Sequence, residues 1–162
     1  MLEVIKTRRS IRKFRPDPVA EPDVHALLEA AMCAPSAVNE QAWQFVVLSA
    51  DVLERYLALN SNAPTGAPTG ILVCRDLARE KAPGYSVQDC SAAVQNILLA
   101  AHALGLGAVW TAVFPDHHAS VRTLLSLPAT VEPFAFIPIG HPAERPAAVD
   151  RFDATRVHRN GW

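Results

Sequence analysis

Three arginines and a serine stand within five positions near the start of the chain: Arg8, Arg9, Ser10 and Arg12. Forked guanidinium donors match the oxygens of a phosphate monoester, and their positive charge offsets its negative charge. A basic turn exposed to water is the alternative interpretation, since small clusters of Lys and Arg are common on protein surfaces. The pattern therefore indicates a candidate phosphate site.

A second segment, residues 34–43, reads APSAVNEQAW and combines a rigid residue with polar ones. Pro35 ends the apolar helix predicted before it, because proline lacks a backbone donor and clashes with the preceding turn. Ser36 and Asn39 then offer polar side chains for binding. The alternative is a Pro-Ser turn that only ends a helix.

These two segments resemble the nitroreductase-like family of FMN-dependent oxidoreductases. The family pattern R-R-S-x-R-x-F matches residues 8–14, and A-P-S-x-x-N-x-Q-x-W-x-F matches residues 34–45. Three later stretches fit the family's long central helix, the strand after it and its last core strand, at residues 88–96, 105–110 and 137–144. Because five motifs in the family's order cover nearly the whole chain, it is identified as a small single-domain member.

The resemblance implies a role for each matching residue. Arg8 and Arg9 would contact the FMN phosphate and ribityl chain, and Ser10 would add a hydroxyl to the same group. Arg151 resembles the family's late arginine on the phosphate. Arg12 would lie near flavin N1 and O2, where a fixed cation stabilises the negative charge of the reduced ring.

Two further groups complete the implied site. One would reach the flavin from the second subunit of an intertwined homodimer, and consists of Pro35, Ser36 and Asn39. The other would present backbone N–H groups to flavin N5 and O4, and consists of Trp110, Thr111 and Ala112. A plain core position is the alternative for Trp110 and for Trp43.

The sequence departs from the family pattern in two places. Val149 stands two residues before Arg151, where the family normally has a lysine, so part of the phosphate charge is missing or supplied elsewhere. Residues 60–70 contain no lysine, although some relatives use an Asn and a Lys there, and Asn60 and Asn62 are both candidates for the asparagine. The segment that forms a substrate lid in larger relatives is short, so we expect an open pocket.

The function implied by the resemblance is that of an FMN-dependent NAD(P)H oxidoreductase. NAD(P)H would give a hydride to flavin N5 and leave, and a small electron-poor organic such as a nitroaromatic or a quinone would then take the electrons, in a ping-pong order. No side chain is expected to be catalytic, because the cofactor carries the chemistry. The alternatives are an FMN-binding or storage protein that does not turn over, a specialised flavin-dependent reductase of the same family, and a structural domain without a ligand.

Composition limits the other classes of function. The chain has 162 residues, of which 50% are hydrophobic and 19% charged, as in one compact domain. A net charge of -1 argues against a nucleic-acid surface. With no apolar leader and no apolar run of membrane length, we expect a cytoplasmic protein without a membrane partner. Three cysteines are predicted to be buried thiols in a reducing compartment, namely Cys33, Cys74 and Cys90.

No metal site is predicted, because the adjacent His117 and His118 would point about 100° apart on a helix.

An α+β fold must position these residues, and the resemblance implies a mixed central sheet flanked by helices in three layers. Periodicity and punctuation predict helices at 2–7, from Pro22 to Pro35, at 50–59, 86–104 and 117–125, and strands at 43–48, 71–74, 108–113 and 134–139. The strand at 43–48 is expected to be central because it is apolar. Residues 145–162 are too polar to fold alone, so we expect this tail of a single domain, residues 1–162, to pack on the partner subunit.

Two helices are predicted to have deeply buried faces. In the first the stripe consists of Val24, Leu27, Leu28, Ala31 and Met32, and in the long helix at 86–104 the deepest face consists of Val87, Val94, Ile97, Leu98, Ala101 and Leu104. The long helix is apolar on most sides, which favours burial against a second subunit.

Overall fold

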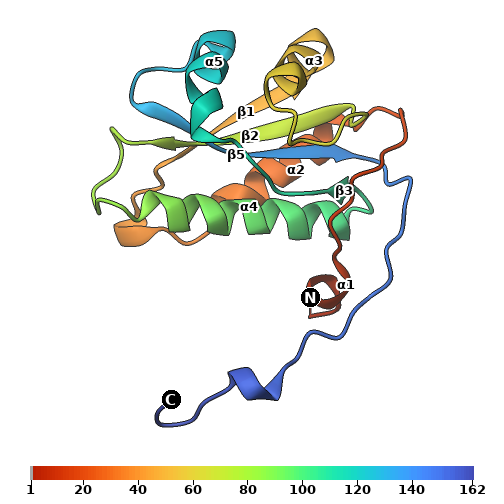
Figure 1. The fold of residues 1–162 in the computed structure, drawn as a ribbon, viewed down its shortest axis with the longest axis vertical. Helices are drawn as coiled ribbons and strands as arrows, with labels where there is room; N and C mark the ends of the chain where they lie inside the picture. Colours follow the sequence, from red (N-terminus) through yellow and green to blue (C-terminus); the bar gives the residue numbers. More distant parts are fainter. Residues whose placement is uncertain (1) are drawn as a thin grey trace.

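In the computed structural model, which describes residues 2–162, a five-stranded sheet lies between two layers of helices (Figure 1). Helices α2 (Glu21–Met32) and α4 (Ser86–Ala103) cover one face, and α3 (Ala50–Leu59) and α5 (Pro115–Leu125) cover the other. Each face has its own apolar core, with Leu27, Ile97 and Ile137 in the first and Tyr56, Val121 and Phe136 in the second. The α+β class and the three layers are confirmed.

The sheet order is β1-β2-β5-β3, with β4 also paired to β5. The strands are β1 (Trp43–Ser49), β2 (Thr69–Asp76), β3 (Gly107–Ala108), β4 (Thr111–Ala112) and β5 (Val131–Gly140). Every pair among the described strands is antiparallel, where a mixed sheet was expected.

Strand β1 lies at an edge of the sheet, so its predicted central position is wrong. Phe45 packs on the core of one sheet face and Leu48 lies in the core of the other, and burial on two faces does not require a neighbouring strand on both sides.

The strand predicted over residues 108–113 is divided into β3 and β4. Ala108 pairs with Ile139 and Thr111 with Phe136, so the same register places Val109 opposite Pro138. Proline has no N–H to donate to a ladder, which explains a break at this position.

The helices begin and end within a few residues of the predicted positions, but three residues of the predicted faces are exposed. Met32 in α2 is 53% exposed, and Val87 and Leu104 at the two ends of α4 are 40% and 45% exposed. Cys90 and Ala93 are buried in α4 instead. The prediction that all three cysteines are buried is wrong for Cys33, which is exposed just after α2.

The two chain ends lie on the same side of the molecule. Helix α1 (Leu2–Thr7) has no buried residue, and the tail after β5 runs past it, away from the sheet (Figure 1). The tail has a single turn of 3-10 helix, Ala154–Arg156, and exposes large apolar side chains, among them Phe152 at 78% and Trp162 at 103%. No helix among the described residues is long and apolar enough to cross a membrane.

Candidate functional site

The arginine segment is held in extended form against the end of the sheet. The backbone N–H of Ile11 donates to the carbonyl of Ala108 in β3 at 3.0 Å. The carboxylate of Glu144 accepts from the backbone N–H of Arg12 at 2.7 Å and from that of Lys13 at 3.3 Å. These contacts fix the backbone, bury Ile11 and leave the side chains of Arg12 and Lys13 exposed.

Basic side chains from both ends of the chain meet around this segment. A cavity of about 650 Å³ lies between α1 and the tail and is lined by Arg8, Arg9 and Arg151 among others. A neighbouring cavity of about 610 Å³ is lined by Arg9, Ser10, Arg12, Lys13 and Arg151, with Glu144 as its acidic residue. The structure therefore brings Arg151 next to four predicted site residues, Arg8, Arg9, Ser10 and Arg12, that precede it by more than a hundred positions in the sequence.

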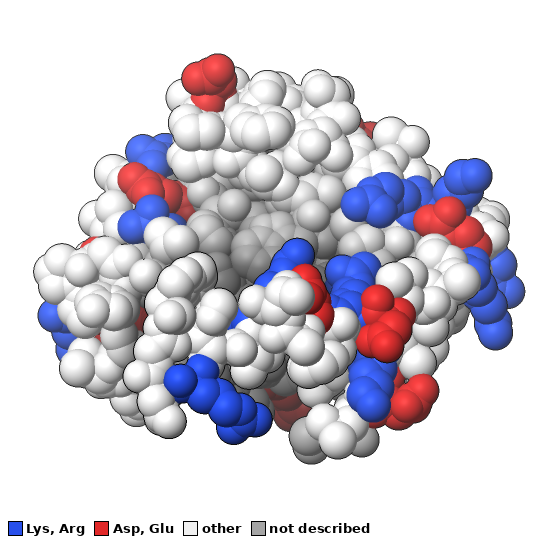
Figure 2. Space-filling view, turned by 60° about the horizontal axis from the view of Figure 1, so that its bottom comes forward, with Lys and Arg blue, Asp and Glu red and all other residues white. Residues whose placement is uncertain are grey.

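Seen obliquely from the side of the chain ends, the molecule is hollowed, and Lys and Arg side chains gather along part of the rim (Figure 2). Four ion pairs form among the described residues, and none of them involves Arg8, Arg9, Arg12 or Arg151. These cations therefore lack an acidic side chain within ion-pair distance in the described chain.

The arginines have hydrogen-bonding capacity that residues 2–162 do not use. Arg9 donates to the carbonyls of Ala147 and Lys6, both at 2.9 Å, and to that of Arg8. Arg8 Nη1 and Arg9 Nη2 are nevertheless buried without a partner in this part of the chain. Burial, and then the charges of Arg151 and Arg9, lower the pKa of Arg8. Unpaired donors beside mutually repelling cations fit a phosphate, which would satisfy both.

The segment that we call the elbow, residues 35–41, leads from α2 to β1 and has an unusual backbone. Val38, Asn39 and Gln41 have φ values of 44°, 54° and 50°. This left-handed region is unfavourable for a β-branched residue such as Val38, and each such residue costs about 1–3 kcal/mol. The conformation therefore persists only because the surroundings hold it.

Side chains within and below the elbow supply that support. Ser36 Oγ accepts from the backbone N–H of Gln41 at 3.1 Å, and Asn39 Oδ1 accepts from Gln41 Nε2 at 3.1 Å. Asp89, in the first turn of α4, accepts from the backbone N–H of Ala37 at 3.0 Å.

The elbow and the arginine segment lie at opposite ends of α4. The elbow is bonded to Asp89 near the start of that helix, and α1 is bonded to its end through Thr7 Oγ1 and His102 Nε2, 2.8 Å apart. Thirteen residues of α-helix separate Asp89 from His102, which is roughly 20 Å along the axis. One chain therefore does not bring the two groups of predicted site residues together.

The third predicted group lies at the break between β3 and β4. Trp110 is 40% exposed and packs against Phe134, with ring centroids 5.9 Å apart, so it is not a plain core residue. Thr111 is buried and donates its hydroxyl to the carbonyl of Phe136 at 2.8 Å.

Asn60 and Asn62, the two candidates for the family's asparagine, both lie beside Ala112 in β4. Their Nδ2 atoms donate to the Ala112 carbonyl at 3.2 Å and 3.3 Å. Asn60 also donates to Tyr56 Oη at 3.0 Å in the core. Both asparagines thus fix the backbone at the end of the third group.

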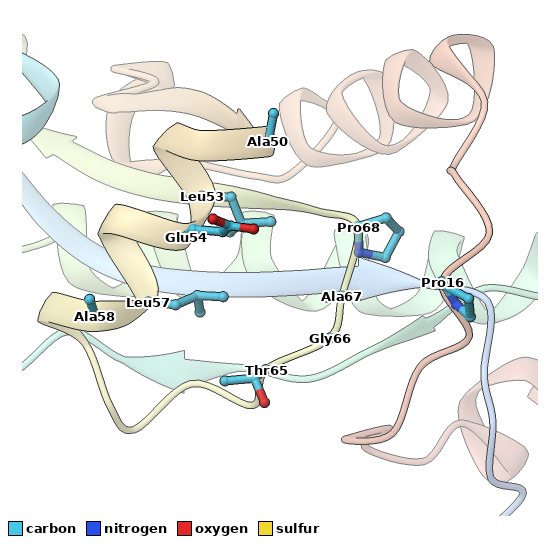
Figure 3. A pocket seen from close by; sticks show the side chains of 10 residues that line it. All are labelled: Pro16, Ala50, Leu53, Glu54, Leu57, Ala58, Thr65, Gly66, Ala67 and Pro68. Atoms are coloured by element: carbon cyan, nitrogen blue, oxygen red, sulfur yellow. The ribbon is translucent and has the colours of Figure 1, made fainter.

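The short loop after α3 borders an open, mostly apolar cavity of about 600 Å³ (Figure 3). Glu54 is the charged residue of its lining, which comes from α3, from residues 65–68 and from Pro16. None of the predicted flavin-binding residues lines this cavity, so it is separate from the arginine site.

Some residues of the site were not singled out from the sequence. Lys13 and Glu144 line the arginine cavity, and Glu40 and Asp89 are buried beneath the elbow. Lys13 and Glu40 lie inside the two motifs, so they could have been found. Glu144 and Asp89 are distant in sequence and polar in type, and their contacts depend on the tertiary fold.

The model of the nitroreductase family matches residues 5–65 and 55–141, which is most of the chain. A protein of Methanothermobacter thermautotrophicus, provisionally named NADH dehydrogenase/NAD(P)H nitroreductase, is 50% identical over 100% of this chain and 87% of its own length. The FMN reductase [NAD(P)H] of Bacillus subtilis is 30% identical over 98% of this chain and 73% of its own.

A solved structure of the same family has a similar fold. A provisionally named nitroreductase of Desulfovibrio desulfuricans, crystallised in complex with FMN, has a TM-score of 0.86 and 35% identity over 99% of this chain and 96% of its own. The matched residues include both the arginine segment and the elbow. The chain therefore belongs to the nitroreductase family.

Proposed function

We propose that this chain is an FMN-dependent NAD(P)H oxidoreductase that reduces small electron-poor organics such as nitroaromatics and quinones. The observation that carries the proposal is the cluster of Arg8, Arg9 and Arg151, in which Arg8 and Arg9 each keep a buried, unpaired guanidinium donor that suits a phosphate. Relatives named FMN reductase [NAD(P)H] and a family structure containing FMN support flavin as the nucleotide that carries it.

The residues that would hold FMN divide by chemistry. The phosphate end would be bound by Arg8, Arg9, Ser10 and Arg151. Lys13 lies beside them and supplies the positive charge that the family's lysine would have given at the position of Val149. By resemblance to the family, Arg12 would place a cation near the pyrimidine edge of the ring, and the backbone N–H groups of Trp110, Thr111 and Ala112 would face its reactive side. When bound, FMN supplies the redox chemistry, accepting a hydride from NAD(P)H and passing electrons to the second substrate in ping-pong order.

The complete site needs two copies of the chain. The elbow and the arginine segment are roughly 20 Å apart along α4, and a twofold dimer with the two copies head to tail brings the arginine end of one beside the elbow of the other. Pro35, Ser36 and Asn39 then contact flavin bound mainly by the partner. Exposed apolar side chains at Val87 and Leu104, and Phe152 in the tail, support burial against a second copy. Residues 1–162 act as one flavin-binding domain whose tail, residues 145–162, packs on that copy.

The test begins with purified protein from which any flavin has been removed. Added FMN should bind with a shift in its visible absorbance, and NADH or NADPH should bleach it under anaerobic conditions. Steady-state oxidation of NAD(P)H with a nitroaromatic or quinone acceptor should follow, and sedimentation should give a dimer. Bleaching without turnover would favour a storage protein, and absence of FMN binding would refute the proposal.

A further inference from the structure

Two buried carboxyl groups connect the elbow to neighbouring elements: that of Glu40, within the elbow itself, and that of Asp89, in α4. Glu40 is 3% exposed and Asp89 is 4% exposed. One oxygen of Asp89 accepts from the Ala37 N–H at 3.0 Å, and Glu40 Oε2 accepts from the N–H groups of Lys81 and Ala82. Asp89 thus ties the elbow to α4, and Glu40 ties it to the loop before α4.

The other oxygen of each carboxyl has no donor among residues 2–162. Glu40 Oε1 and Asp89 Oδ2 are both buried without a donor, and Glu40 is close enough to Asp89 for its charge and its side chain to raise the pKa of Asp89. Ionised carboxylates only accept hydrogen bonds, so two facing carboxylates would leave both oxygens unsatisfied and two negative charges together. One proton between them satisfies both oxygens and removes one charge.

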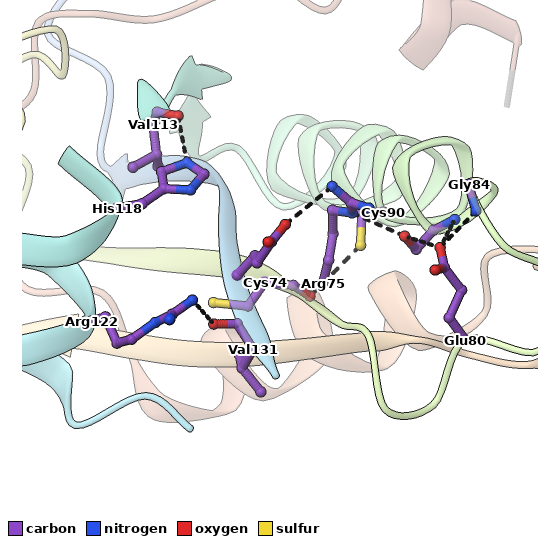
Figure 4. A network of polar contacts seen from close by, with 11 residues as sticks. Cys74, Arg75, Glu80, Gly84, Cys90, Val113, His118, Arg122 and Val131 are labelled. Atoms are coloured by element: carbon purple, nitrogen blue, oxygen red, sulfur yellow. Dashed lines mark hydrogen bonds and ion pairs between the residues drawn. The ribbon is translucent and has the colours of Figure 1, made fainter. Parts of the chain in front are cut away.

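The charges around the pair favour retention of that proton. Glu80 contributes a further negative charge, although its carboxylate accepts from Ser86 Oγ at 2.6 Å. Arg75 is the nearby cation from β2, and it is occupied by Ser86 Oγ and by Glu132 of β5, at 2.9 Å and 3.3 Å (Figure 4). Burial, with the charges of Glu40 and Glu80, raises the pKa of Asp89 despite the opposing hydrogen bond from the Ala37 N–H.

The elements packed around the pair carry further charged groups, namely Glu29, Asp76, Arg79 and Lys81. Asp76 of β2 accepts from Gln44 Nε2 at 3.0 Å, and the loop's Lys81 meets Glu40 through its backbone. On α2, Glu29 pairs with His25 at the surface.

We propose that Asp89 and Glu40 share a single proton, and that this proton makes them the positioning residues of the elbow. The elbow is the part that needs such an anchor, because three of its residues are held in the left-handed region. Its consequence for flavin binding rests on the proposed function, but the shared proton itself does not.

Amide variants test the proton count. Asp89→Asn and Glu40→Gln each place one N–H donor between the two facing oxygens, as the proton does. In the double variant, the amide NH2 groups of the two side chains face each other, and neither finds an acceptor. Exchange of the Ala37 amide in flavin-free protein, followed by NMR, should stay within about threefold of wild type in each single variant and become about tenfold faster or more in the double variant. The dissociation constant for FMN should follow the same order.

Titration gives a readout that a purely structural contact would not move. The carboxyl carbon of Asp89 should titrate above its usual range in wild type and should return toward or below that range in Glu40→Gln, where the amide donates to it. Ala37 exchange in wild type, corrected for base catalysis, should accelerate as pH rises through the Asp89 titration, and in Asp89→Asn it should not. These two pH dependences test the shared proton even if the double variant does not fold.

The inference is overturned if Asp89 titrates at or below its usual pKa in wild type, or if a single amide variant releases the elbow as much as the double one. Failure of wild type to bind FMN would refute the proposed function and leave these two measurements unaffected. FMN binding that is equally tight in the double variant would overturn the positioning role alone.

Discussion

Replacement of Arg8 by Met should separate the affinity for FMN from that for riboflavin, which lacks the phosphate. Methionine keeps much of the length and apolar stem of the side chain and removes its donors and its charge. A hydrogen bond to a charged partner contributes about 1.5–3 kcal/mol, so loss of one or more Arg8–phosphate bonds should raise the Kd for FMN roughly 10- to 150-fold. The Kd for riboflavin should change much less, because the neutral ribityl hydroxyls have no negative charge for Arg8 to offset.

The free protein should respond in the opposite sense. Because burial and the neighbouring charges of Arg9 and Arg151 disfavour the Arg8 cation, its removal should leave thermal unfolding of the flavin-free protein unchanged or shifted upward. At saturating FMN the ligand-induced stabilisation should fall by about 1.4 kcal/mol for each tenfold loss of affinity.

Quenching of flavin fluorescence in titrations with FMN and with riboflavin provides the assay. Arg55→Met is the matched control: Arg55 is exposed on α3, across the sheet from the arginine segment, and its loss changes the net charge equally. The assignment of Arg8 to the phosphate is refuted if both flavins lose affinity in equal proportion, or if Arg55→Met weakens FMN as much as Arg8→Met does.

Two more predictions concern Gly107, which packs against the arginine segment, and Glu80, which accepts hydrogen bonds from the first turn of α4. In Gly107→Ala the added Cβ would lie 2.7 Å from Ile11 Cγ2, so unfolding in urea should show a loss of about 1–3 kcal/mol, whereas Gly161→Ala, in open space, should show none. At Glu80, hydrogen bonds from Ser86 lower the pKa; its stabilising effect is therefore present above the ordinary value of 4.5 and lost as pH falls through the lowered one. Glu80→Gln should flatten that part of the stability–pH curve, and an unchanged curve would contradict the assignment.

The sequence predicted helices well where local signals agree with tertiary structure. The helix predicted at 86–104 is observed as Ser86–Ala103, and Gly105 follows it with a φ of 76°, as a left-handed end requires. The apolar period could not predict that Val87 and Leu104, at the two ends of this helix, are exposed. Periodicity indicates which side of a helix is buried, but it does not indicate how far the sheet beneath the helix extends.

Strand order was harder to predict for a related reason. In the apolar run of residues 45–48, Phe45 packs on the core of one sheet face and Leu48 lies in the core of the other, and this pattern is the same for an edge strand and a central one. Strand β5, which contains Pro133 and Pro138, is paired on both sides, although proline normally favours an edge. A bulge near Pro133 and the break opposite Pro138 accommodate them, and both depend on partner strands.

The candidate site combines local motifs with a contact that only the fold reveals. The motifs located the arginine segment and the elbow, and the fold shows Arg151 beside the first of them. Spacing alone could not reveal the pair of buried acids, because Glu40 lies inside the elbow motif but Asp89 comes from α4, and only the fold brings the two together.

The separation of the two half-sites along α4 has a genetic consequence for the proposed dimer. Each chain contributes arginines to one flavin and an elbow to the other, so a chain with a defective Arg8 and a chain with a defective elbow are damaged at different ends. When the two are mixed, one site of the hybrid collects both lesions and the other collects neither. Two inactive alleles would then complement each other and restore one working centre per hybrid pair.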